Sequence, residues 1–153
     1  LMATSNTRRV CKRRSDSKGR CLLCNIEMGE FTMTICGRYA DNQDVPGLFN
    51  YLVLELAEWK TPISFCGDIN LTLDPRQDST PCHPLSRMCQ SREALRYLMP
   101  AHRLVDVWRY VRPKEPGFTP YSAPHKSCSR IDIFQASKEF IPDIKIELHP
   151  RIT

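Results

Sequence analysis

Two polar residues follow a short apolar run in the middle of the chain. The run is "PISF", residues 62–65, and Asp68 and Asn70 come after it in "GDINLTLDP". Because side chains alternate along a strand, an Asp-x-Asn pair at a strand end points both polar groups to one side. A carboxylate beside an amide can hold a metal, a water or a phosphate. These residue types are also common in turns for local reasons, so the pair alone favours a turn.

Several predicted elements surround this pair. "TPISFC" predicts a short buried strand that delivers Gly67 and Asp68, and "RCLLCNIE" and "FTMTIC" predict a hairpin closed by a turn at Gly29. Residues 45–60 have apolar side chains at three- and four-residue steps behind Pro46, which predicts a helix. The pair therefore comes after a hairpin, a helix and a further strand.

The second half of the chain continues the alternation. We expect a loop over residues 74–90, a helix over 91–99 and a helical turn in "HRLVDVWRYV". "GFTPYS" and "CSRIDIF" predict two strands around a projecting loop "APHK", and "DIKIELH" predicts one more strand. Alternating strands and helices indicate a layered α/β domain.

Composition places the chain among ordinary soluble domains. It has 153 residues, of which 41% are apolar and 25% charged, enough for one domain with a real core. No run approaches the roughly 18 apolar residues of a membrane span, and the amino terminus lacks the apolar core of a secretory signal. We therefore expect an intracellular protein, nuclear or cytoplasmic, with no membrane partner and with its eight cysteines reduced.

The positive charge is concentrated at the amino terminus. Residues 1–20 hold seven basic side chains and one acidic side chain, a net +6, so the other residues sum to −1 within the total of +5. Such a run could contact phosphates, but it is more often a solvated segment. We predict a basic leader without regular structure over residues 1–15 and a domain over residues 16–153.

Three motifs in order carry a resemblance to a known family. "CGDIN", "HRLVDVWR" and "FTPYSAPHKSCSRIDIF" resemble, in wording and spacing, the endonuclease domain of LINE-type non-LTR retrotransposons. That domain belongs to the exonuclease-endonuclease-phosphatase superfamily, which includes DNase-I-like enzymes and apurinic endonucleases. The resemblance covers roughly residues 16–153, and it changes the interpretation of Asp68 and Asn70 from turn residues to site residues.

The resemblance implies a fold and a reaction. The fold would be a four-layer α/β sandwich of the DNase-I-like type, here incomplete at both ends, and the partner would be DNA. The reaction would be phosphodiester hydrolysis with Mg²⁺ or Mn²⁺ and no small-molecule cofactor. Asp68 would orient or deprotonate the attacking water and bind the metal weakly, and Asn70 would donate a hydrogen bond to the phosphate.

The resemblance also assigns residues outside this pair. Tyr39 in "RYADN" matches a tyrosine whose hydroxyl approaches the scissile phosphate, although Asp41 stands where the family has proline. Asp132 in "SRID" matches the aspartate that orients a catalytic histidine. The DNA-binding residues implied by the family's hairpin and backbone contacts are Thr119, His125, Ser129 and Arg130.

Several of the family's catalytic groups have no counterpart in this sequence. The family's amino-terminal asparagine and metal-binding glutamate lie upstream of the position of "GRCLLCN", and its closing "SDH" lies beyond "LHPRIT". His149 is no substitute because Pro150 follows it and no Ser-Asp precedes it. Groups that act together lose several orders of magnitude in rate when members are missing, so we expect hydrolysis to be weak or lost. An open sheet face and edge would also lower stability.

Two alternatives remain open. A non-catalytic nucleic-acid-binding remnant is supported by the basic leader but opposed by the nearly neutral body. A zinc module would use Cys21, Cys24, Cys82, His83 and Cys89, but the spacing of the last three fits no familiar knuckle. Cys21 and Cys24 would also face opposite ways in a straight strand. The sequence makes no prediction about oligomeric state.

Overall fold

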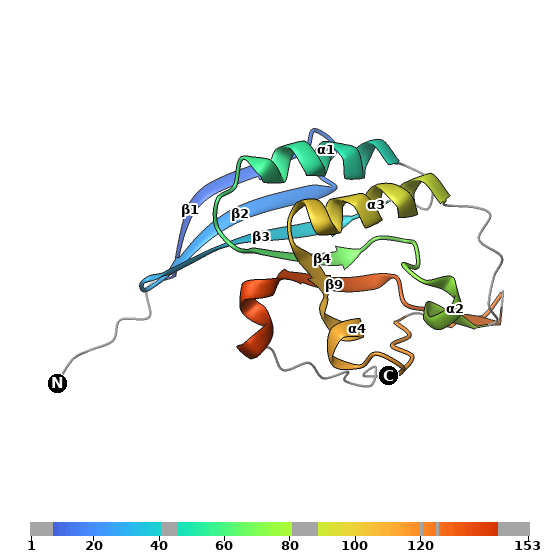
Figure 1. Cartoon of the computed structure of the whole chain (residues 1–153). Coiled ribbons are helices and arrows are strands. Elements are labelled where there is room, and N and C mark those ends of the chain that lie inside the picture. The colour runs from blue at the N-terminus through green and yellow to red at the C-terminus, as the bar shows by residue number, and fades with distance from the viewer. Residues whose placement is uncertain (1–7, 41–45, 81–88, 120, 125, 144–153) are drawn as a thin grey trace.

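A mixed six-stranded sheet forms the frame of the molecule (Figure 1). The computed structural model describes residues 8–40, 46–80, 89–119, 121–124 and 126–143. The strands of the sheet follow the order β1-β2-β3-β4-β9-β6. Their bounds are Arg8–Ser15 for β1, Cys21–Met28 for β2, Phe31–Tyr39 for β3, Ile63–Asp68 for β4, Asp132–Ser137 for β9 and Leu104–Asp106 for β6.

The predicted hairpin, helix and central strand are confirmed. β2 and β3 pair antiparallel across a turn in which Gly29 has a φ of 66°, a left-handed value that glycine adopts without steric cost. α1 spans Pro46–Ala57, and β4 then returns parallel to β3. α1 is thus the crossover of a β-α-β unit, and the carboxyl ends of β3 and β4 meet at one edge of the sheet.

The expected leader is corrected by the structure. Residues 8–15 form β1, an edge strand paired antiparallel with β2, instead of a segment without regular structure. Two of the basic side chains have partners in or just after α1: Arg14 forms an ion pair with Glu55 of α1 and another, at 2.9 Å, with Glu58, which follows the helix. The Lys12 ammonium lies 4.3 Å from the centre of the Trp59 ring. Charge counting alone cannot find these partners because they come from a helix far along the sequence.

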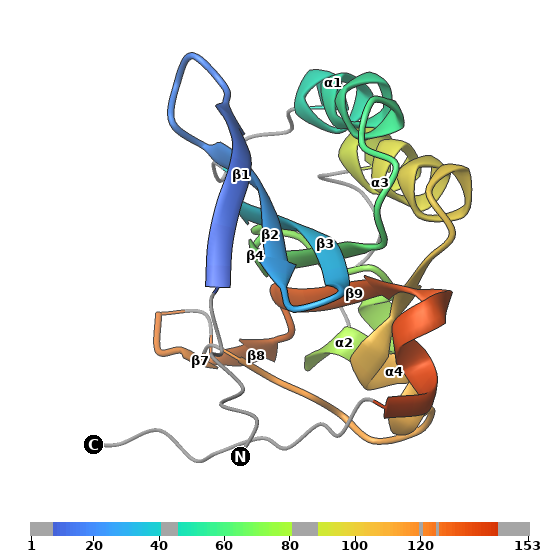
Figure 2. The same ribbon diagram turned by 90° about the vertical axis from the view of Figure 1, so that its left-hand side faces the viewer.

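Two helices cover one face of the sheet (Figure 2). α1 and α3, which spans Cys89–Ala101, pack against each other and over the central strands. Their apolar faces meet Cys36 of β3 and Phe65 of β4, both with no exposed surface, in one contiguous core. The helix over residues 91–99 is therefore confirmed, with longer bounds.

The remaining segments refine the predictions. The expected loop at 74–90 includes a short helix, α2 (Pro75–Asp78), and a strand, β5 (Ser79–Thr80). "HRLVDVWRYV" divides into β6 and a short helix, α4 (Val107–Val111), because the Asp106 carboxylate caps the helix by accepting from the Arg109 N–H at 3.2 Å.

The segments "GFTPYS" and "CSRIDIF", predicted as two strands around "APHK", contain three strands. β7 (Tyr121–Ser122) and β8 (Ser127–Ser129) form the hairpin, and β5 joins them in a second sheet of order β5-β8-β7. "RIDIF" instead enters the large sheet as β9, and η1, a 3₁₀ helix over Lys138–Asp143, follows it. The expected strand in "DIKIELH" lies outside the described residues. Within those residues, no helix is long and apolar enough to cross a lipid bilayer.

Candidate active site

Three predicted site residues lie side by side at the ends of adjacent strands. Asp68 ends β4, and its register partners are Tyr39 at the end of β3 and Asp132 at the start of β9. Register partners on adjacent strands point to the same face, and strands lie about 4.8 Å apart. Since Phe65 points toward the helices, Asp68 points to the opposite face. We name Tyr39, Asp68 and Asp132 the catalytic row, after the role that the resemblance predicts for them.

The close approach of β4 to β3 depends on one glycine. Gly67 has a φ of 138°, and a Cβ at this position would lie 1.8 Å from the Arg38 carbonyl oxygen. No side chain can be accommodated at that distance without moving the backbone of β3. Gly67 therefore fixes the position of Asp68 at the strand end.

Asn70 is held in a strained turn beside the row. Its φ is 49°, in the left-handed region that asparagine tolerates better than most residues. Its backbone N–H donates to Asp68 Oδ1 at 2.8 Å, and its Nδ2 donates to the Ala40 carbonyl oxygen at 2.5 Å. One Nδ2 hydrogen is thereby used in fixing the amide, and the second is left for another acceptor.

The electrostatic environment of Asp68 disfavours its charge. Burial of the half-buried carboxyl raises its pKa above the ordinary value of 3.8, the N–H of Asn70 opposes this, and the facing carboxylate of Asp132 raises the pKa further. Asp132 and Tyr39 are exposed, the latter by 54%. The row thus brings two carboxyl groups together on a face that solvent and ligands can reach.

Thr119 forms hydrogen bonds with the backbone at Asp132 of the row. Its hydroxyl oxygen accepts from the backbone N–H groups of Ile131 and Asp132, both at 3.2 Å, and its own N–H donates to the Ser129 carbonyl oxygen at 2.8 Å. Thr119 and Ser129 therefore lie next to the row, close to the start of β9. Ser129 itself belongs to β8 and is half-buried. His125 lies outside the described residues.

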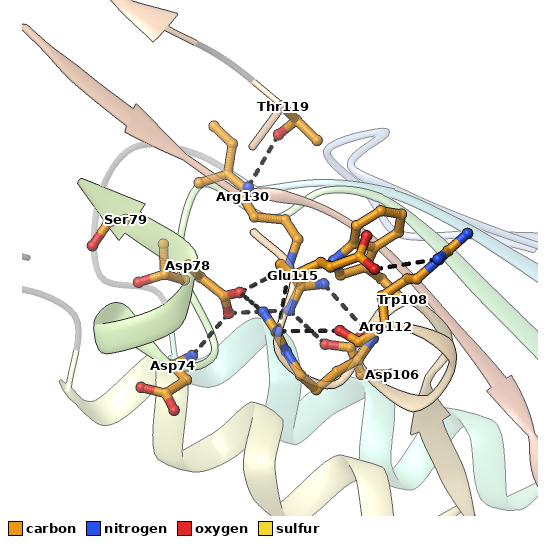
Figure 3. Close-up of polar contacts among 12 residues, drawn as sticks. Asp74, Asp78, Ser79, Asp106, Trp108, Arg112, Glu115, Thr119 and Arg130 are labelled. Atoms are coloured by element: carbon orange, nitrogen blue, oxygen red, sulfur yellow. Dashed lines mark hydrogen bonds and ion pairs between the residues drawn. The ribbon is translucent and has the colours of Figure 1, made fainter. Parts of the chain in front are cut away.

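Arg130 differs from its predicted role as a DNA contact. It is 3% exposed, and its guanidinium forms ion pairs with Asp78 at 2.9 Å and Asp106 at 2.6 Å (Figure 3). Arg109 Nη2 also binds Asp78, at 2.7 Å. In this arrangement the guanidinium is not free to bind a phosphate. We name Asp78, Asp106, Arg109 and Arg130 the arginine cluster; it ties α2, β6 and α4 to the segment before β9.

The hydrogen bonds to Asp78 outweigh the effect of burial on its charge. Burial disfavours the charge of Asp78, but hydrogen bonds from Arg130, the backbone of Asp74 and Arg109 hold its pKa below the ordinary value. No local pattern in the sequence indicates a partner for Asp78. A usable signal was present at Asp106, because an acid directly before a helix caps it.

The described residues give no support to a zinc module. No group of three or more His, Cys, Asp or Glu side chains that could hold a metal ion occurs among them. Cys21 is buried and contacts Cys36, and Cys24 points to the other face of β2. Cys82 and His83, and the side chain of Cys89, lie outside the described residues.

Comparison with known proteins identifies the fold. No family model matches the chain. Among solved structures, the AP endonuclease LMAP of Leishmania major superposes with a TM-score of 0.65 at 18% identity, over 83% of this chain and 48% of that one. The endonuclease domain of TRAS1, a telomere-specific non-LTR retrotransposon, gives 0.58 at 14% identity, over 86% and 57%.

A third match is TDP2 of D. rerio, solved with a single-stranded DNA product. It gives a TM-score of 0.56 at 13% identity, over 86% of this chain and 55% of that one. The chain thus spans about half the length of the solved chains that it matches. These neighbours share a mixed α/β architecture, and the chain accordingly has the DNase-I-like fold.

Proposed function

We propose that this chain is a nuclease-like domain that binds the phosphate backbone of DNA and hydrolyses phosphodiester bonds weakly. The observation that carries the proposal is the catalytic row, in which Tyr39, Asp68 and Asp132 are register partners at one edge of the sheet. Their face is the one that α1 and α3 do not cover. The matched proteins include an AP endonuclease and a retrotransposon endonuclease domain, which supports this reaction class.

Each residue has a role that its geometry permits. Asp68 accepts a proton from the attacking water, and its raised pKa makes it a better base once ionised. The free Nδ2 hydrogen of Asn70 donates to the phosphate oxygen that gains charge. The Tyr39 hydroxyl, on the exposed end of β3, donates to a second phosphate oxygen.

A divalent cation fits the row in part. Two carboxyl groups are register partners; burial and, to a smaller degree, the Asp132 carboxylate raise the pKa of Asp68, and a divalent ion would relieve the repulsion between the two carboxylates. Mg²⁺ commonly binds one or two carboxylates and completes its shell with water and phosphate. Asp68 and Asp132 would hold it, and when bound it would stabilise charge on the phosphate.

Slow turnover follows from the small number of acids at the site. The described residues hold no third carboxyl or histidine beside Asp68 and Asp132 that would complete a metal cluster. A site with two acids binds a hard cation less tightly than a site with more, and catalytic groups that act together lose rate steeply when members are missing. We therefore propose hydrolysis well below that of a full nuclease.

A finer proposal concerns origin and location. We infer a retrotransposon origin from "LVDVWR" and "SRIDIF", supported by the fold match to the TRAS1 domain. In this proposal the β7–β8 hairpin with His125, together with Thr119 and Ser129, meets the DNA backbone, and the protein works where DNA is, in the nucleus or cytoplasm. A reverse-transcriptase reading frame next to the coding sequence would support this origin.

DNA binding without hydrolysis is the second candidate, and the edge strand favours it. Arg9 and Arg13 of β1 are exposed, and no ion pair joins either to another residue in the described part of the chain. Basic side chains of this kind neutralise phosphates without contributing to the chemistry. This candidate predicts strongly salt-dependent binding with no product.

Supercoiled-plasmid nicking with Mg²⁺ tests the proposal, with fluorescence anisotropy of a short DNA duplex as a second readout. Asp68→Ala should lower the nicking rate by about 10²–10⁴-fold while leaving DNA affinity within a few fold. Glu30→Gln is the matched control, because Glu30 is exposed at the far end of the β2–β3 hairpin and its loss should change neither readout.

The outcomes separate the two candidates. Nicking that survives Asp68→Ala would show that the catalytic row does no chemistry. DNA binding with no nicking by folded wild-type protein would leave the binding candidate. Absence of both nicking and binding would refute both.

A further inference from the structure

Two buried thiols lie beside an arginine that lacks a hydrogen-bond partner. The Sγ atoms of Cys21 and Cys36 are 3.8 Å apart, and the two residues are 2% and 0% exposed. Arg38 is 6% exposed, and its Nε, Nη1 and Nη2 atoms have no hydrogen-bond partner. Its guanidinium lies 3.7 Å from the centre of the Phe49 ring. All three residues point from β2 and β3 toward the helices.

A neighbouring anion would stabilise the buried guanidinium of Arg38. Burial lowers the pKa of Arg38 to about 10, so the group is still charged at neutral pH, and an unpaired buried charge is costly. The nearby acids are already engaged: Asp16 accepts from the backbone N–H groups of Arg20 and Cys21, and Glu55 binds Arg14. The thiols remain as the source of a negative charge.

The two thiols are not equivalent. A hydrogen bond between the two sulfurs lowers the pKa of the Cys21 thiol, although burial opposes this. The same hydrogen bond, together with burial, raises the pKa of Cys36. The other ionisable groups that influence the two thiols are Asp16 of the β1–β2 turn, Arg38 of β3, Glu55 of α1 and Cys66 of β4, and Arg20 influences Arg38.

We propose that Cys21 and Cys36 form a redox-active dithiol, with Cys21 as the nucleophilic thiolate and Arg38 as its counter-ion. The oxidant is a small peroxide. The Cys21 thiolate attacks one peroxide oxygen, the O–O bond breaks, and hydroxide leaves, which gives a sulfenic acid at Cys21. The Cys36 sulfur then attacks the Cys21 sulfur, and its proton leaves with the displaced oxygen as water. The pair has lost two electrons and gained a disulfide.

A cavity lies near the backbone of Cys21. About 410 Å³ in volume, it lies between the β1–β2 turn and the start of α1, and Asp16, Arg20, Leu48 and Tyr51 are among its lining residues. Asp16 Oδ1 accepts the backbone N–H of Cys21 at 2.8 Å, so the cavity lies one residue away from Cys21, whose side chain does not line it. The two residues are diagonal neighbours on one face of β2 and β3, and their sulfurs must close from 3.8 Å to about 2.05 Å.

Timed peroxide treatment of the whole chain tests the proposal. The protein is quenched at intervals, unfolded with an alkylating reagent and digested, and its peptides are weighed. We expect a disulfide-linked Cys21–Cys36 peptide to form faster than Cys128 is oxidised, because a neighbouring cation and a second thiol favour reaction at Cys21. Cys128 is the internal control, because it is half-buried in β8 with no neighbouring thiol described.

Two variants make the test decisive. Arg38→Met should slow the reaction about tenfold by removing the counter-ion. Should that variant not fold, Cys36→Ser replaces it, and Cys21 should then accumulate as a sulfenic acid that a dimedone probe traps. Equal rates at Cys21 and Cys128, or a disulfide that joins other cysteines, would overturn the proposal. None of these readouts is nicking, so the inference stands or falls independently of the proposed function.

Discussion

Two pairs of aspartates occupy opposite electrostatic environments in this small domain. In the arginine cluster, Asp78 and Asp106 both face Arg130, and the pKa of Asp78 is held below its ordinary value. In the catalytic row, Asp68 and Asp132 face each other, and the pKa of Asp68 is raised. The first pair is satisfied within the protein, whereas the second lacks a positive partner among the described residues. Under the proposed function, the charges that face each acid distinguish the structural Asp78 from the catalytic Asp68.

Removing the shared cation should have the largest effect on stability. Arg130→Met leaves Asp78 and Asp106 with much of their charge uncompensated, and breaking a buried ion pair in this way costs about 3–5 kcal/mol. Urea unfolding followed by circular dichroism measures the loss. The matched control is Arg112→Met, which breaks an exposed ion pair with Glu115 and should cost less than about 1 kcal/mol. Equal losses in the two variants would show that the cluster is not structural.

The next largest effect is expected from Gly67→Ala, which would push β4 away from β3 and so displace the catalytic row. Gly67→Ala places a Cβ against the Arg38 carbonyl and forces alanine into a φ of 138°, so the free energy of unfolding should fall by about 2 kcal/mol or more. Nicking activity should fall with it, because Asp68 moves. Gly47→Ala is the control, since its Cβ meets nothing within 4 Å and alanine favours a helix. A stable, fully active Gly67→Ala protein would refute the role assigned to this glycine.

The sequence predicts features that depend on neighbouring residues better than features that depend on partners far along the chain. The hairpin and α1 follow from local periodicity, and the catalytic row follows from "GDIN" and "SRID" once β4 and β9 are paired. β1 was not predicted because the partners of its Arg14, Glu55 and Glu58, lie some forty residues away. Arg130 was assigned to DNA for the same reason: its partners Asp78 and Asp106 are 52 and 24 residues distant. Long-range partners of charged residues are the part that local reasoning misses.

Acid should affect the two regions in opposite directions. The stability that Asp78 provides is fully present above its unfolded pKa near 3.8 and is lost as the pH falls through its lower folded-state pKa. The raised pKa of Asp68 gives stability only at low pH, and this is lost as the pH rises through the folded-state pKa. Acid titration of Asp78→Asn should therefore lack part of the stability loss seen below pH 3.8 in wild-type protein. An unchanged profile would contradict the assignment of Asp78 to the cluster.

The smallest expected effect has the opposite sign to the others. Asp68→Asn removes a charge that burial and Asp132 disfavour at neutral pH, while the amide oxygen can still accept the Asn70 N–H. The free energy of unfolding should therefore rise, by no more than about 0.5 kcal/mol for this half-buried position, even as nicking is lost. Asp78→Asn, with the same change in chemistry, should lower it because Arg130 and Arg109 lose a charged partner. Thermal unfolding of the two variants tests these opposite signs. If both substitutions destabilise the protein, Asp68 is a structural acid like Asp78. A gain at Asp68 beside a loss at Asp78 would show that the row gives up stability to keep a charge available for a ligand, as expected of a site that acts on phosphate.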